Sequence, residues 1–194
     1  MLLATEGARV TLLDISPAAI ELGLRRARAN GAGDRVLGFA RDASDLSCFN
    51  DAAFDLVFAS AAVHHTLKYP NAFAELVRVL KPGGRLVLAE TWGNNRLLNL
   101  ARRLRARLSG EPPEQGEEII FSDREIAMLR TQFRDVDVTP MNLFAMGKRL
   151  FRGRFTNRLA RGVVAALEGI DRVLLRLFPA LRRFCGEALI VAVK

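Results

Sequence analysis

The sequence predicts an α/β protein whose core is a doubly wound, mostly parallel sheet. Short apolar runs alternate with helical patterns over residues 7–90, and turns rich in glycine or proline separate them. Strands that alternate with helices at this pace form parallel βαβ units. The chain has 194 residues, of which 50% are hydrophobic. A single domain with one core is therefore the simplest organisation.

Each element of the first half has its own local signal. Residues 2–6 end a helix that Gly7 closes. Ser16 and Pro17 suit the N-cap and the first position of a helix that runs to Ala29. The pattern predicts strands at 9–14, 36–40, 54–59 and 85–90, a helix at 70–80 and a turn at 81–84. Residues 54–59 are nearly all apolar, so we expect that strand to be buried on both faces.

The second half is richer in helices and in arginine. It predicts an Arg-rich helix at 94–108, a loop at 110–116, a capping box from Ser122 to Glu125, a strand at 133–139 that Pro140 stops, and a last strand at 188–193. A long helix at 155–178 has apolar residues at helical spacing: Leu159, Val163, Leu167, Ile170, Leu174 and Leu177. The first interpretation of this stripe is core packing. The alternative is an interfacial helix on anionic lipid.

The charge is confined to the second half. The chain has 29 Lys+Arg and 21 Asp+Glu, and residues 1–95 hold ten of each, so the whole net charge of +8 lies in residues 96–194. This excess indicates an anionic substrate or a membrane surface, and the alternative is genomic base composition together with solvated helix faces. Nucleic acid is not expected, because the aromatic residues are mostly Phe at core-like spacing. Cys48 and Cys185 lack metal-type spacing, which predicts reduced thiols, no metal site and a cytoplasmic protein.

Polar residues follow several of the predicted strands. Asp14, Asp42, Ser60 and Glu90 all fall at carboxyl ends of strands, where ligands of parallel sheets bind. Asp14 could accept hydrogen bonds from the hydroxyls of a ribose, or it could cap the following helix. Glu90 could bind substrate, or it could be a solvated carboxylate.

Three segments then appear in a fixed order after the Asp14 strand. They are RDASDL (residues 41–46), FDLVFASAAVHH (54–65) and AFAELVRVLKPGGRLVLAE (72–90), the last with Glu75 and Arg78 in its helix. With them the chain resembles the class I S-adenosylmethionine-dependent methyltransferases that act on small molecules and lipids. The resemblance covers residues 3–92. It implies a Rossmann-like fold with an antiparallel C-terminal strand.

The resemblance also implies a division of labour and a set of site residues. Residues 1–93 would form the cofactor-binding core, and residues 94–132 and 141–185 would be helical insertions that cover the substrate. S-adenosylmethionine would be bound by Asp14 (ribose), Ile15 (adenine face), Asp42 and Ala43 (adenine edge), and Ala59 and Ser60 (methionine part). His64, or with less support His65, would act as a base toward a hydroxyl acceptor, and the alternative is that one of the pair only caps or packs.

The chain departs from the family at its start. The family's first strand and its Gly-rich loop should precede the Asp14 strand, and Met1 falls within the helix that follows that loop. We therefore expect a fragment of a longer methyltransferase that acts on a small-molecule or lipid-linked acceptor. The alternative is a non-catalytic relic or interaction module that does not bind the cofactor. An NAD-dependent oxidoreductase is disfavoured, because Tyr69 is the only tyrosine and no hydride-transfer constellation accompanies it.

Overall fold

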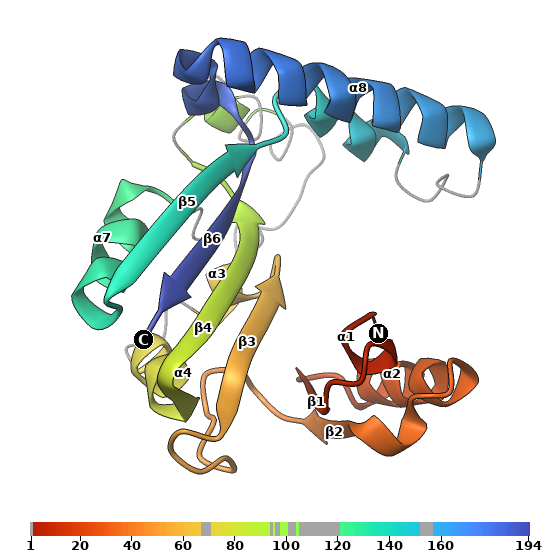
Figure 1. Cartoon of the computed structure of the whole chain (residues 1–194), viewed down its shortest axis with the longest axis vertical. Helices are drawn as coiled ribbons and strands as arrows, with labels where there is room; N and C mark the ends of the chain where they lie inside the picture. Colours follow the sequence, from red (N-terminus) through yellow and green to blue (C-terminus); the bar gives the residue numbers. More distant parts are fainter. Residues whose placement is uncertain are drawn as a thin grey trace.

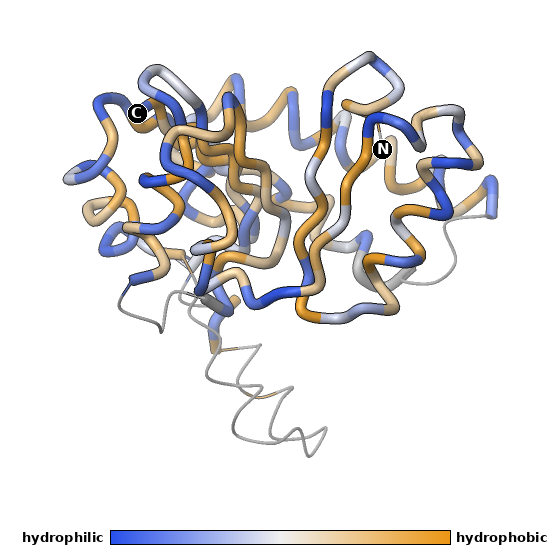
Figure 2. Tube along the Cα trace, turned by 90° about the horizontal axis from the view of Figure 1, so that it is seen from below, coloured by the Kyte–Doolittle hydropathy of each residue, from blue (hydrophilic) through white to orange (hydrophobic). Residues whose placement is uncertain are grey.

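The computed structural model describes residues 2–66, 71–93, 95, 98–100, 104, 121–151 and 157–194. Its strands form two sheets, one of two strands and one of four. Figure 1 shows the small sheet and its helices beside the edge of the larger sheet that carries β3. Figure 2 shows hydrophobic and hydrophilic stretches alternating along the chain. None of the helices in the described part of the chain combines the length and the apolar character that a membrane crossing requires.

The small sheet and its helices confirm the elements predicted for residues 2–40. Strand β1 (Val10–Asp14) pairs in parallel with β2 (Val36–Ala40), and α1 (Leu2–Thr5), α2 (Pro17–Ala29) and the 3-10 turn η1 (Gly33–Arg35) accompany them. The side chain of Ser16 caps α2 by accepting from the amide of Ala19. Helix α2 packs closely on β2, because a Cβ on Gly38 would lie 2.5 Å from Cγ2 of Ile20.

The larger sheet has the strand order β3-β4-β6-β5. Strand β3 (Phe54–Ser60) runs parallel to β4 (Leu80–Thr91), while β6 (Glu187–Val193) runs antiparallel to both β4 and β5 (Asp135–Met141). The predicted antiparallel strand at the C-terminus is therefore confirmed. The chain has the α/β, Rossmann-like fold class expected from its sequence.

Helices cover the larger sheet and close one of its ends. They are α3 (Val63–Thr66), α4 (Ala72–Val79), α7 (Asp123–Gln132), η2 (Ala145–Phe151), α8 (Arg158–Leu177) and η3 (Pro179–Phe184). The capping box predicted for α7 is present, with Ser122 and Glu125 bonding reciprocally. Figure 1 shows α8 lying across the end of the sheet where β5 finishes. The core lies between the sheet and these helices and includes Leu86, Leu88, Phe121, Ile126, Leu129 and Ile190.

Two predictions about strands were wrong, and each has a physical reason. Strand β3 is not buried on both faces, since Leu56 is 40% and Phe58 57% exposed. Within the described residues, β3 pairs with β4 alone and its other edge has no strand partner. Strand β5 does not stop before Pro140 but runs to Met141. Because β5 is the outer strand of the sheet, the missing N–H of a proline is tolerated there.

The long helix α8 divides its apolar residues between two faces. Leu167 and Leu174 are half-buried, whereas Leu159 and Ile170 are 75% and 48% exposed. The core-packing interpretation of the whole stripe was therefore wrong. Of the Arg-rich helix predicted at 94–108, only residues 95, 98–100 and 104 are described, and residues 98–100 are helical. The loop predicted at 110–116 lies outside the described residues.

Candidate functional site

A cavity of about 370 Å³ lies between the two sheets. Thr11 and Leu13 of β1 line one side, and β3 lines the other with six of its seven residues, Phe54 and those from Leu56 to Ser60. Neighbouring residues of a strand point to opposite faces. Because consecutive residues of β3 line the cavity, side chains from both faces of the strand reach it, and the cavity therefore lies along the edge of the strand. The unpaired edge of β3 and the side of β1 away from β2 consequently face the same space.

Two carboxylates lie at the ends of the paired strands β1 and β2. Oδ1 of Asp14 accepts a hydrogen bond from the amide of Ser16 at 2.8 Å, and Oδ1 of Asp42 accepts one from the amide of Ser44 at 2.8 Å. The amide of Arg41 donates to the main-chain oxygen of Asp14 at 2.9 Å, which holds the two strand ends together. No described residue donates to Oδ2 of either carboxylate. Each local turn thus orients a carboxylate and leaves one oxygen for a further hydrogen bond.

The residues after β3 form a tight turn beside the cavity. Ala59 and Ser60 line the cavity, and Ala61 adopts a left-handed backbone with φ of 49°. The amide of Ala61 donates to the main-chain oxygen of Ala89 in β4 at 2.9 Å. A left-handed alanine is uncommon and persists only where surrounding contacts hold it. The turn is therefore built into the site and directs the chain into α3.

Glu90 and His64 form a buried pair that holds this turn from the side of β4. Oε1 of Glu90 accepts from the amides of Ala62 at 3.1 Å and Val63 at 2.9 Å, and Oε2 lies 2.7 Å from Nδ1 of His64. Glu90 is 2% and His64 6% exposed. Of the two alternatives for Glu90, the solvated carboxylate was therefore wrong. The His64 ring also contacts the ring of the exposed His65, with centroids 4.0 Å apart and the ring planes tilted by 40°.

A network around Arg78 fixes the loop that joins the two sheets. Arg78 donates to the main-chain oxygens of Phe49 and Leu46 and to both carboxylate oxygens of Glu75, each at 2.8–2.9 Å. Glu75 in turn accepts from the amide of Leu46 at 3.2 Å. The hydrogen bond from Arg78 lowers the pKa of Glu75 below its ordinary value of 4.5. The network thus anchors to α4 the loop that begins with Asp42.

Aromatic contacts continue this bridge between the sheets. The ring of Phe49 meets those of Phe39 and Phe54 edge to face, with both pairs of centroids 5.1 Å apart. The sequence pattern marked Glu75 and Arg78 only as part of a motif. Their role in holding residues 46–51 was missed, and their spacing of three residues within a helix was the available signal.

The structure brings some of the predicted site residues together and separates others. Ala43, Ala59 and Ser60 line the cavity, and Asp14 and Asp42 lie at the adjacent strand ends. Ile15 is 73% exposed next to Asp14. His64 and Ile15 are not among the residues that line the cavity. Both cysteines are unpaired, and burial raises the pKa of the Cys185 thiol to about 11.

Comparison with known proteins supports the resemblance of the first half of the chain to methyltransferases. Residues 1–88 match the family model of a methyltransferase domain. The chain is 41% identical over 88 residues to a demethylmenaquinone methyltransferase from Clavibacter sepedonicus, a match that covers 45% of this chain and 34% of that protein. It is 39% identical over 84 residues to a ubiquinone/menaquinone biosynthesis C-methyltransferase from Paracoccus denitrificans, covering 43% and 33%. The matched region thus spans about a third of the length of these relatives.

Solved structures extend the likeness to the whole fold. Geranyl diphosphate C-methyltransferase from Streptomyces coelicolor, in complex with Mg²⁺, geranyl diphosphate and S-adenosyl-L-homocysteine, superposes with a TM-score of 0.63 at 20% identity, covering 100% of this chain and 67% of that one. An S-adenosylmethionine-dependent methyltransferase from Methanosarcina mazei gives 0.58 at 25% identity, covering 100% and 85%. Residues 1–88 are therefore similar to the methyltransferase domain family, and the chain has the fold of the class I S-adenosylmethionine-dependent methyltransferases.

Proposed function

We propose that the protein transfers a methyl group from S-adenosylmethionine to a small-molecule or lipid-linked acceptor. One observation carries the proposal. Residues 1–88 match a methyltransferase domain, and within them Asp14 ends β1 and Asp42 follows the paired strand β2, while Ala59 and Ser60 line the cavity at the end of β3. Residues 1–93 would form the cofactor core, with residues 94–132 and 141–185 as the cover over the acceptor.

The cofactor roles follow from which atoms are available. Oδ2 of Asp14 would accept from the ribose hydroxyls, and Ile15 would lie against the adenine face. Asp42 would accept from the adenine amino group beside the amide of Ala43. The backbone of Ala59 and Ser60 would approach the methionine part. A sulfonium methyl group is already activated, so in-line positioning of the acceptor can supply most of the acceleration.

We propose His64 as the base if the acceptor is a hydroxyl. The carboxylate of Glu90 accepts from Nδ1 of His64 at 2.7 Å, which fixes the orientation of the imidazole ring. A base held by a carboxylate is the usual arrangement for general-base catalysis. Under this proposal, His64→Gln lowers the single-turnover rate by about 10²-fold or more. His65→Gln, at the neighbouring exposed ring, is the matched control.

The names of relatives and the charge of the chain support an anionic or lipid-linked acceptor. Relatives are named for demethylmenaquinone, for phthiotriol dimycocerosates and for geranyl diphosphate. The last of these acceptors is itself an anion. The excess of basic residues over residues 96–194 is suited to such a molecule. We also propose peripheral membrane contact through the basic C-terminal helices.

We propose that the active form contains one more strand between β1 and β3. Within the described residues, β1 pairs with β2 alone and β3 with β4 alone. Both open edges border the same cavity, which is lined mainly by apolar residues. A strand pairing with both would join the sheets into one and bury Leu56 and Phe58. The second candidate function, a non-catalytic module of the same fold, is favoured only by these unpaired edges.

Calorimetry with S-adenosylhomocysteine tests the proposal. The chain is titrated as it stands and also after a strand with a glycine-rich turn has been added upstream. In a form that binds, Asp14→Ala weakens binding by about 1.5–3 kcal/mol, the scale for losing a charged hydrogen-bond partner. Asp34→Ala, at an exposed carboxylate on η1, is the control. An absence of heat from both forms would refute cofactor binding, and tight binding by either would exclude the non-catalytic module.

A further inference from the structure

We propose that α8 lies flat on an anionic lipid surface, with one exposed face of the helix inserted among the lipids. This deepens the membrane contact proposed above and rests on the proposed function only for the lipid-linked acceptor. The proposed surface is formed by α8 and η3 alone. Helix α8 has three faces: one is packed on the protein, one is apolar and exposed, and one is basic and exposed.

The first face attaches the helix to the rest of the protein. Residues 160, 164, 167, 171 and 174 recur at alternating steps of four and three and are buried or half-buried. Asp171, at 4% exposure, accepts from the amides of Leu143, Phe144 and Ala145 at 2.8, 2.8 and 2.9 Å. A helix fixed by three main-chain donors presents its remaining faces in a constant orientation.

The second face is apolar and exposed. Its helical members are separated by four, seven, three and four residues, which places them along one side of the helix. They are Leu159 (75% exposed), Val163 (37%), Ile170 (48%), Val173 (56%) and Leu177 (64%), followed by Phe178 (56%). Leu159 directly precedes Ala160 of the packed face, so the two faces lie about 100° apart around the axis. The exposed stripe is therefore a separate surface, and it extends along the full length of α8.

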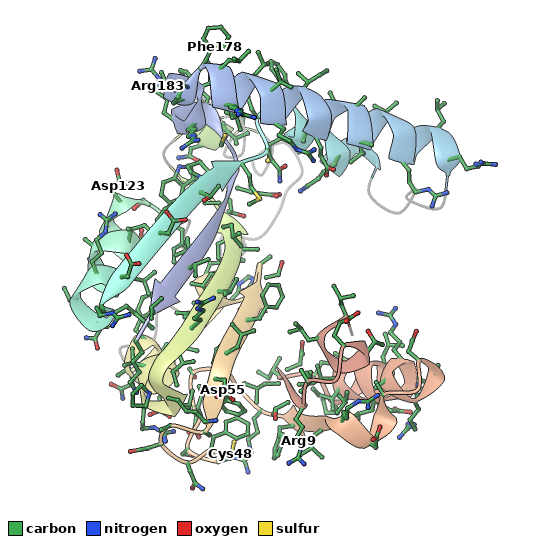
Figure 3. The ribbon with its side chains drawn as sticks, in the orientation of Figure 1. Arg9, Cys48, Asp55, Asp123, Phe178 and Arg183 are labelled. Carbon is green, nitrogen blue, oxygen red and sulfur yellow. The ribbon has the colours of Figure 1, made fainter. Side chains whose placement is uncertain are left out.

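The third face is basic and adjoins the apolar stripe. Arg158, Arg161, Arg172 and Arg176 are all exposed, and Glu168 is the one acidic residue among them. Arg182 and Arg183 of η3 continue the positive charge beyond the helix. Figure 3 shows Phe178 and Arg183 both directed away from the sheet at this end of the molecule. The arginines of α8 thus flank the apolar stripe on the side opposite to the packed face.

Charge complementarity identifies the occupant of this surface. An interfacial helix combines an apolar stripe with flanking Lys or Arg, which attract anionic headgroups while the stripe enters the acyl boundary. A second copy of the chain would bring the same arginines and would add like-charge repulsion. An anionic membrane supplies apolar and negative partners together, and each basic residue near such a surface adds attraction.

Vesicle sedimentation without cofactor tests the proposal, so its result does not depend on methyl transfer. The chain should bind phosphatidylcholine vesicles containing phosphatidylglycerol, and binding to phosphatidylcholine alone should be weaker. Arg172→Gln with Arg176→Gln should weaken binding roughly 30-fold, at about fivefold for each arginine. Arg124→Gln with Arg130→Gln, at exposed positions of α7, is the matched control and should change binding less than about twofold.

The apolar stripe is tested by a second variant and by a spectroscopic probe. Ile170→Glu with Val173→Glu should abolish vesicle binding and leave the melting curve unchanged, because both side chains are about half exposed. Phe178→Trp should shift its emission to the blue on anionic vesicles, whereas Met128→Trp on α7 should not.

Three results would overturn the proposal. The first is equal binding to neutral and anionic vesicles. The second is binding that neither double variant reduces. The third is a dimer that Ile170→Glu with Val173→Glu dissociates, in a protein that does not bind vesicles.

Discussion

Glu90 is the residue whose replacement gives the sharpest test of how the candidate site is built. Its side chain is completely buried, and it accepts hydrogen bonds from two main-chain amides and one imidazole at 2.7–3.1 Å. Glu90→Ala removes all three acceptor contacts. Glu90→Gln keeps the size and one acceptor oxygen but removes the charge and replaces Oε2 with an amide nitrogen.

The expected losses of stability follow from these contacts. A buried donor that loses its acceptor costs about 1–3 kcal/mol. The donors of Val63 and His64 are buried and that of Ala62 is partly exposed, so the two buried donors give a loss of about 2–6 kcal/mol for Glu90→Ala. A water molecule entering the cavity would offset part of this loss. Glu90→Gln should lose about 1–2 kcal/mol, because Ala62 and Val63 can still donate to the remaining oxygen. We expect the free energy of unfolding to fall in the order wild type, Glu90→Gln, Glu90→Ala.

Urea unfolding followed by circular dichroism measures these free energies. Glu21→Ala is the control, since Glu21 is exposed on α2 and lies 3.9 Å from Arg25. Such a surface pair should contribute less than about 1 kcal/mol. The reasoning is refuted if Glu90→Ala falls within about 0.5 kcal/mol of wild type, the range of an ordinary surface substitution. It is also refuted if Glu90→Gln is the less stable of the two variants.

Three further predictions concern packing and charge. Asp171→Ala should lower the free energy of unfolding by about 3–5 kcal/mol, because three amides lose a charged acceptor, and Asp171→Asn should lose less in the same urea titration. Gly38→Ala should destabilise by about 1–3 kcal/mol in thermal melts, since the added Cβ would overlap Ile20. Folding lowers the pKa of the Glu75 carboxyl. The ionised carboxylate therefore stabilises the fold above the ordinary pKa of 4.5, and this stabilisation is lost as the pH falls through the lower pKa of the folded state. Urea midpoints of Glu75→Gln should therefore decline less than those of wild type below about pH 4.5.

Local chemistry made much of the fold predictable from the sequence. Ser16 and Pro17 fixed the start of α2, and the capping box from Ser122 to Glu125 fixed the start of α7. These signals act within a few residues, so the sequence alone contains them. The same holds for Asp14, whose position at the end of β1 follows from a short apolar run.

Features that depend on distant partners were not predictable in this way. The environment of Glu90 is decided by residues 26 to 28 positions earlier in the chain. Pro140 continues a strand because β5 lies at the edge, which is a property of the sheet and not of residues 133–140. The sequence of α8 contains more apolar residues at helical spacing than one packed face can bury. The excess of apolar residues was an available signal of an exposed stripe.

The open edge of β3 has a consequence for how the isolated chain behaves at high concentration. A long edge that presents unpaired main-chain groups and apolar side chains is a template on which other chains can form intermolecular β-structure. Leu56 and Phe58 place such a segment at the surface. We expect concentration-dependent aggregation to begin there, and Phe58→Lys to slow it by adding a charge to the edge. Covering this edge of β3 would then protect the protein from aggregation as well as complete the site for catalysis.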